Sequence, residues 1–155
     1  MRCWIGSSLF ENELTISIYS DLFRFIQKPK YHYIHLRMKT LLIGASNNPD
    51  RYAYIAAERL LAHGHELALV GLRPDVIFGH PIETEKILFA NIDTVSLYIG
   101  ALRQPEYYSY ILELNPRRVI FNPGTENPDF ELLLKKNNIQ YEEACTLVLL
   151  GTGQY

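Results

Sequence analysis

One stretch of this sequence restricts the choice of fold more than any other. An apolar run at residues 40–43 leads directly into Gly44, and a second apolar run covers residues 66–70. Between them, residues 51–63 carry small and apolar side chains at helical spacing. A strand, a glycine turn, a helix and a second strand form the opening unit of dinucleotide-binding folds. The sequence therefore predicts a Rossmann-like domain.

The pattern of alternating strands and helices continues to the end of the chain. Further strands are predicted at residues 94–99, 118–121 and 146–150, and further helices begin at Pro105 and at Asn127-Pro128. Strands joined by right-handed helical crossovers form a parallel sheet with helices on both faces. We therefore expect an α/β fold, a doubly wound parallel sheet in a three-layer α/β/α arrangement.

The chain divides into two unequal parts at Met38. Residues 1–37 show no clear periodicity and carry a net charge of +2, whereas residues 38–155 carry −4. Met38 stands immediately before the first predicted strand, as the start of such a domain would. We interpret residues 1–37 as an upstream extension and Met38 as the initiator. The alternative is a packed N-terminal helix over residues 14–26, and an intact mass of the native protein would distinguish the two.

Composition excludes several classes of protein. The 155 residues are 48% hydrophobic and 21% charged, which is typical of one globular domain. The net charge of −2 argues against broad affinity for nucleic acid, and no apolar run approaches the ~20 residues that span a bilayer. Two cysteines suggest no disulfide framework, and the five histidines form no zinc pattern with them. We expect a cytoplasmic protein without a metal site.

The carboxyl ends of the predicted strands are where a ligand is expected, because open α/β sheets bind ligands there. The first of these loops contains Gly44, Ser46 and Arg51. A helix that begins after such a loop presents backbone N–H groups and the positive end of its dipole to an anion. The alternative, a plain turn with a surface arginine, stays open, since only one of the three fingerprint glycines is present.

The loop after the second strand indicates which nucleotide would fit. NAD-binding proteins carry an acid at this point, whereas here Arg73 follows Gly71 and no acid is present. A cation suits a phosphate on the ribose, so coenzyme A or NADP fits better than NAD, and coenzyme A better than NADP. The alternative is an arginine that only faces solvent. Two further candidate loops lie at the same edge: residues 99–104 follow the strand at residues 94–99, and residues 122–125, with Asn122-Pro123-Gly124, follow the strand at residues 118–121.

These segments, taken in order, resemble a known family. The resemblance rests on Ile43-Gly44-Ala45-Ser46, Asn48-Pro49-Asp50-Arg51 with Tyr54, residues 70–73, Gly79, Asn122-Pro123-Gly124 and Cys145. The family is that of the small single-domain CoA-binding proteins, whose fold is similar to the CoA-binding domain of the succinyl-CoA synthetase alpha subunit. The likeness covers nearly all of residues 38–155 and none of residues 1–37.

The resemblance implies a set of CoA-binding residues. They are Gly44, Ala45, Ser46, Arg51, Tyr54, Gly71, Arg73, Gly79, Asn122, Pro123 and Gly124. Those in the first loop would hold the pyrophosphate, Arg73 would meet the adenosine phosphate, and residues 122–124 would border the pantetheine arm. The chain departs from the family where Gly71-Leu72 replaces the usual Asn-Pro.

Three functions remain open from the sequence. The first is a binding protein for CoA or acyl-CoA with no evident catalytic apparatus and a small nucleotide ligand as its partner. The second is an NADP-dependent reductase, for which Tyr98 is the only tempting proton donor and no partner lysine is obvious. The third is an interaction scaffold that binds no nucleotide. Cys145 is interpreted as a small buried apolar side chain rather than a nucleophile.

Overall fold

A computed structural model describes residues 38–155 of the chain. The proposed N-terminal extension and its alternative, a packed helix, lie outside these described residues, so the interpretation of Met38 as the initiator stays a prediction. No helix within residues 38–155 is long and apolar enough to cross a membrane. The same part of the chain contains no group of three or more His, Cys, Asp or Glu side chains placed to hold a metal ion.

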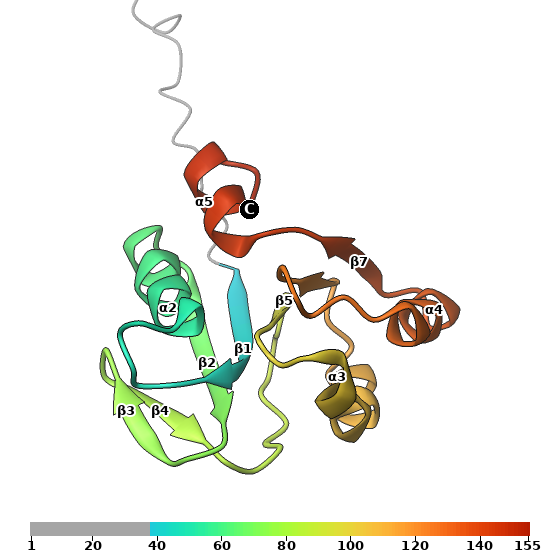
Figure 1. The fold of residues 1–155 in the computed structure, drawn as a ribbon, viewed down its shortest axis with the longest axis horizontal. Coiled ribbons are helices and arrows are strands. Elements are labelled where there is room, and N and C mark those ends of the chain that lie inside the picture. Colours follow the sequence, from blue (N-terminus) through green and yellow to red (C-terminus); the bar gives the residue numbers. More distant parts are fainter. Residues whose placement is uncertain (1–37) are drawn as a thin grey trace, which may run out of the picture. The chain divides into compact units, whose positions relative to one another are not determined.

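The described residues form a seven-stranded sheet in the order β3-β4-β2-β1-β5-β6-β7. The strands are β1 Lys39–Ala45, β2 Glu66–Gly71, β3 Asp75–Ile77, β4 His80–Glu83, β5 Thr94–Leu97, β6 Arg118–Phe121 and β7 Gln140–Glu143. All pairings are parallel except that of β3 with β4. The chain moves outward from β1 in both directions, which confirms the predicted doubly wound Rossmann-like sheet (Figure 1).

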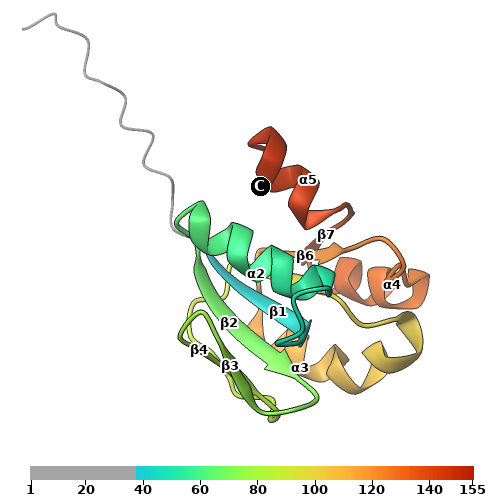
Figure 2. The ribbon, with the colours of Figure 1, turned by 60° about the vertical axis from the view of Figure 1, so that its left-hand side comes forward.

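Helices cover both faces of this sheet. They are α2 Tyr52–Ala62, a 3₁₀ helix η1 Ala101–Tyr107, α3 Tyr108–Leu114, α4 Pro128–Lys136 and α5 Thr146–Thr152. On one face Leu42 and Leu69 pack with Leu60 of α2 and Leu150 of α5. On the other face, side chains of α3 and α4 pack on the sheet, and Figure 2 shows α2 over β1 while α3 and α4 lie apart from it. The three-layer α/β/α arrangement is therefore confirmed.

Small side chains let α2 lie close to the sheet. Ala53, Ala56 and Ala57 are buried, as their helical spacing predicts, and Leu60 is fully buried between α2 and the sheet. Gly64 follows the helix with a positive φ of 81°, which a glycine adopts without strain. The helix predicted at residues 51–63 thus has its buried face and its stop where the sequence places them.

Helix α4 begins as its sequence predicts. The side-chain oxygen of Asn127 accepts a hydrogen bond of 3.2 Å from the backbone N–H of Phe130, and Pro128 occupies the first helical position. The helix ends at Lys136, the residue predicted. Phe130 and Leu134 are fully buried and fix its inner face.

The strand predicted at residues 146–150 is wrong, because Thr146–Thr152 is the helix α5. The run is short and apolar, and such a run does not show whether the chain has helical or strand periodicity. Its helical character appears in the bond from the Leu149 N–H to the Cys145 carbonyl and in the burial of neighbouring Leu149 and Leu150. The last strand is instead β7, a polar edge strand whose residues are mostly exposed.

The region between the second and third predicted strands contains a hairpin that the sequence pattern does not reveal. Strands β3 and β4 pair through a turn at Phe78 and Gly79, whose φ angles are 50° and 78°. A tight hairpin of this kind needs positive φ at both turn positions. Further on, β5 ends at Leu97 rather than at residue 99, and Pro105 lies inside η1 rather than opening the second helix.

The C-terminal residue Tyr155 packs against the amino ends of β1 and β6. The hydroxyls of Thr40 and Tyr155 lie 2.6 Å apart, and the Arg118 guanidinium stands 4.8 Å from the centre of the Tyr155 ring. Arg118 also donates to the Glu142 carboxylate at 2.7 Å. Burial raises the pKa of Tyr155 to about 12, against smaller opposing effects of Thr40 and Arg118. These contacts therefore fasten the end of the chain to the sheet.

Candidate functional site

A cleft of about 1140 Å³ opens at the carboxyl ends of the central strands. It lies between β1 and β5, from which the chain continues in opposite directions across the sheet. Its walls are formed by residues 44–48, 51–53, 72–75, 98–100, 103, 122–125, 145 and 147, with Ile82. This is the crevice in which doubly wound sheets hold their ligands. All four loops that the sequence selects contribute to it.

Eight of the eleven residues predicted to bind a ligand line this cleft. They are Gly44, Ala45, Ser46, Arg51, Arg73, Asn122, Pro123 and Gly124. Tyr54, Gly71 and Gly79 are not among the lining residues. The Tyr54 ring packs 4.9 Å from that of Phe78, and Gly79 forms the hairpin turn between β3 and β4.

Gly44 and Gly71 are glycines because neighbouring strands approach them closely. Gly44 has a φ of 98° at an irregularity in the β1–β2 pairing, and a Cβ placed on it would lie 2.8 Å from the Tyr98 carbonyl oxygen. A Cβ on Gly71 would lie 2.5 Å from the Ala45 carbonyl oxygen. Both distances are shorter than side chains tolerate, so each glycine is required by the contact between strands.

The loop from β1 to α2 is shaped by its own polar side chains. The Ser46 hydroxyl oxygen accepts from the Asn48 N–H at 3.2 Å, and the Asn48 side chain accepts from the Asp50 N–H at 2.9 Å. The Asn47 amide donates to the Asp75 carboxylate, which joins this loop to the one that follows β2. The Ser46 hydroxyl, an acceptor in its loop bond, retains its own hydrogen to donate toward the cleft.

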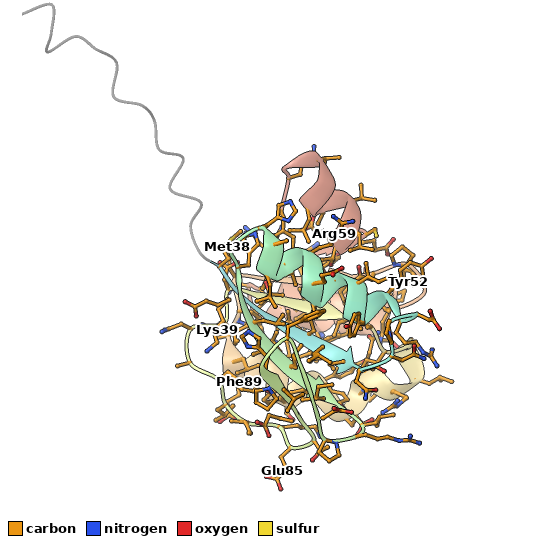
Figure 3. All side chains as sticks on the ribbon, turned by 90° about the vertical axis from the view of Figure 1, so that its left-hand side faces the viewer. Met38, Lys39, Tyr52, Arg59, Glu85 and Phe89 are labelled. Carbon is orange, nitrogen blue, oxygen red and sulfur yellow. The ribbon has the colours of Figure 1, made fainter. Side chains whose placement is uncertain are left out.

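Helix α2 directs its N-terminus into the cleft. Tyr52 and Ala53, its first two residues, line the cavity, and Figure 3 shows Tyr52 at the end of α2 far from Met38. Among residues 38–155 no side chain caps this end, and the first turn contains no acid. The first N–H groups and the dipole of α2 therefore favour an anion here.

The cleft is rimmed by cations. Arg51, Arg73 and Arg103 all line it, and Asp75 is the only acid among the described lining residues. The Asp75 carboxylate accepts bonds from the Asn47 amide and from the N–H of Val76. The sequence analysis did not select Arg103, although it lies inside the predicted loop at residues 99–104. Three guanidinium groups against one carboxylate favour a ligand with several negative charges.

Asn122 braces the cleft wall with its side chain. The residue is 4% exposed, and its amide nitrogen donates to the Ser96 hydroxyl at 2.8 Å and to the Leu97 carbonyl at 3.0 Å. Its amide oxygen accepts from the Thr146 N–H at 2.9 Å. The amide thus joins β5, β6 and the start of α5. The exposed residues of this loop at the cleft are Pro123 and Gly124.

Tyr98 and Cys145 lie on the inner wall of the cleft. Burial raises the pKa of Tyr98 to about 12, and the nearby Thr146 and Ser96 side chains oppose this only in part. Cys145 is half-buried and lines the cavity, so it does not belong to the apolar core in which the sequence interpretation places it.

The chain matches the family model described as CoA binding domain over residues 38–151. A solved structure of an uncharacterized protein is 47% identical, with a TM-score of 0.75, and the match covers 76% of this chain and 98% of that one. A conserved hypothetical protein from Pyrococcus furiosus is 26% identical, with a TM-score of 0.65 and coverage of 72% and 97%. A Thermus thermophilus protein at 18% identity and TM-score 0.69, with coverage of 94% and 100%, shares the fold.

No curated protein matches this chain at a significant level. The family match begins at the residue where the Rossmann-like domain begins and includes every loop of the cleft. The match with the structure at 47% identity covers almost the whole length of that protein. The chain therefore belongs to the family of CoA-binding domains.

Proposed function

We propose that the cleft binds coenzyme A or an acyl-CoA and that the protein acts as a binding module rather than an enzyme. The observation that carries this proposal is the arginine-rich rim at the point where the strand order diverges. Arg51, Arg73 and Arg103 meet there at a cavity large enough for a dinucleotide-sized ligand. A cytoplasmic location, inferred from composition, accompanies this proposal.

The positions of the cations suggest how the nucleotide lies. Arg51 and the N-terminus of α2 lie together, so they suit the pyrophosphate. Arg73 comes from the loop after β2, where it suits a phosphate on the ribose. Pro123 and Gly124 are exposed on the other side of the cleft, and since Glu126 accepts from the Gly124 N–H at 2.9 Å, the carbonyls of this turn are what suits the amide-bearing pantetheine arm.

NADP is the competing ligand, because Arg73 also suits its ribose phosphate. An NADP-dependent reductase would need a proton donor activated by a neighbouring cation. Tyr98 has a pKa raised to about 12, and no lysine is among the described residues that line the cleft. These features favour a binding protein over a reductase.

Thermal-shift titration with CoA, NADPH and NADH tests the proposed function. A ligand that binds only the folded state stabilises it by about 2.7 kcal/mol at a concentration 100 times its Kd. We expect the Tm to rise with CoA concentration, to rise less with NADPH and to stay constant with NADH. Stabilisation by NADPH without stabilisation by CoA would contradict the proposal and revive the reductase.

A bound acyl-CoA should also protect Cys145 from alkylation. The thiol is half-buried on the cleft wall, so a ligand in the cavity covers it. With acetyl-CoA at 100 times its Kd, about 1% of the protein stays free, and alkylation of Cys145 should slow by roughly tenfold or more. Peptide mass mapping separates Cys145 from Cys3, and NADH at the same concentration is the control. Equal alkylation rates with and without acetyl-CoA would place the ligand elsewhere.

A further inference from the structure

Gln104 is a polar side chain buried completely beneath the cleft. It is 0% exposed, and its amide nitrogen donates to the carbonyl oxygens of Ile99 at 3.0 Å and Thr125 at 2.6 Å. Its amide oxygen accepts from the Asn127 side chain at 2.8 Å. Asn127 in turn caps α4 through its own oxygen. A single amide thus joins η1, the segment after β5 and the segment after β6.

The two carbonyls that Gln104 holds belong to two neighbouring stretches of the cleft wall, one after β5 and one after β6. Ile99 is followed by Gly100, and Thr125 is preceded by Gly124, and all four residues line the cavity. The pairing of β5 with β6 ends at Leu97 and Phe121. Just beyond that pair the Asn122 amide bonds to the Leu97 carbonyl, and farther along the Gln104 amide links the two segments at Ile99 and Thr125. The separation of these walls therefore depends on its two donated bonds.

Burial of the Gln104 amide is unfavourable unless its donors and its acceptor are hydrogen-bonded. Burying an amide without partners destabilises the folded state, so an apolar side chain would be the default for such a site. Ile99 and Thr125 are themselves 5% and 6% exposed, so water has little access to their carbonyls. An apolar replacement of Gln104 would leave both carbonyl oxygens without this donor, and the two segments would then separate or twist to reach water.

We propose that Gln104 is a positioning residue that sets the spacing of the Gly100 and Gly124 walls for the uncharged arm of the ligand. The inference rests on the proposed function. Arg51, Arg73 and the N-terminus of α2 come from the loops after β1 and β2, so the phosphate-binding side does not depend on Gln104. Loss of the Gln104 bonds should weaken contacts with the pantetheine arm and leave the nucleotide contacts intact.

The test compares CoA with 3′,5′-ADP, which keeps the 3′-phosphate and the first 5′-phosphate but lacks the second phosphate of the pyrophosphate and the pantetheine arm. In Gln104→Met we expect calorimetry to show the Kd for CoA raised about tenfold or more, a cost of about 1.4 kcal/mol. The Kd for 3′,5′-ADP should remain within about twofold of the wild-type value, which corresponds to ~0.4 kcal/mol. An unchanged Kd for CoA, or an equal rise for both ligands, would overturn the proposal.

Thr40→Val is the matched control. Thr40, like Gln104, is fully buried, and valine at this position removes the 2.6 Å hydrogen bond with Tyr155. Thr40 lies at the amino end of the sheet, away from the cleft. This variant should have a lower Tm and unchanged Kd values for both ligands. A Thr40→Val protein with the same selective loss of CoA affinity would show that lowered stability, and not wall spacing, causes the effect.

If Gln104→Met does not fold, a second variant tests the same proposal. Asn127→Asp retains the oxygen that caps α4 at the Phe130 N–H but replaces the donor to Gln104 with an acceptor. It should show the same selective loss of CoA affinity, and wild-type affinity would overturn the proposal. Wild-type protein that binds no CoA would contradict the proposed function itself, whereas wild-type binding with unaltered variants would contradict the role of Gln104 alone.

Discussion

Arg73→Glu should lower the affinity for CoA about 100-fold while the Tm of the free protein stays close to the wild-type value. The substitution removes a charge-assisted contact worth about 1.5–3 kcal/mol and places a carboxylate beside a phosphate. Arg73 is exposed on the cleft rim, so the fold does not depend on its packing. Calorimetric titration at low and high salt measures the effect, and the loss should be larger at low salt.

Arg59→Glu is the control for the change in net charge. Arg59 is exposed two turns along α2 from Tyr52, as the labels in Figure 3 show, and it is not among the residues that line the cleft. This variant carries the same overall charge as Arg73→Glu and should bind CoA with nearly wild-type affinity. Unchanged CoA affinity in Arg73→Glu would remove Arg73 from the site, and an equal loss in both variants would indicate a general charge effect.

Gly44→Ala should destabilise the folded protein by about 3 kcal/mol, because two penalties add. The backbone at Gly44 has a φ of 98°, a conformation that side chains disfavour. The new Cβ would also lie 2.8 Å from the Tyr98 carbonyl oxygen and 2.9 Å from the Ile99 side chain. The Tyr98 carbonyl belongs to the main chain that continues β5, so it cannot move without disturbing the sheet. Urea denaturation measures the loss as a lower midpoint at constant m-value.

Gly64→Ala separates the two penalties. Gly64 has a similar φ of 81°, but a Cβ there would meet nothing within 4 Å. Only the conformational cost of about 1–2 kcal/mol should remain. If Gly44→Ala and Gly64→Ala lose the same free energy of unfolding, the close approach of β5 to Gly44 does not determine the choice of glycine.

The parts of the fold that the sequence predicts well are those with a strong local signal. Helix α4 has a side-chain cap at Asn127, a proline at the first position and an inner face of large apolar side chains, so both of its ends are predicted correctly. Helix α2 has a stripe of buried alanines at helical spacing. The first two strands and Arg118–Phe121 are apolar because both faces of a parallel sheet are covered.

The elements that the sequence mispredicts have weak or ambiguous local signals. The apolar run that forms α5 is too short to distinguish a helix from a buried strand. Strand β7 is polar because it lies at the sheet edge, and the hairpin of β3 and β4 depends on an unusual left-handed Phe78. Each of these assignments is decided by tertiary packing rather than by the pattern of neighbouring residues.

The residues of the candidate site also fall into two groups, those that local sequence signals predict and those that depend on distant partners. Loops at strand ends are predictable once the strands are known, which is why Arg51 and Arg73 are found from the sequence. The roles of Gln104 and Asn122 depend on partners 21 and 24 residues away, so no local pattern reveals them. The sequence selects Gly44 and Gly71 for the close approach of a ligand, which stays a prediction, and the structure adds that neighbouring main chain leaves no room for a Cβ at either position.

The Asn122 brace has a consequence for mutational screens. Since one amide fastens the first turn of the C-terminal helix to the tips of two central strands, that helix and the inner wall of the cavity must shift together. A substitution on the hidden side of the helix, at Leu149 or Leu150, would therefore change ligand occupancy from a distance. Libraries designed to tune affinity should sample this remote packing layer as well as the residues in contact with the ligand.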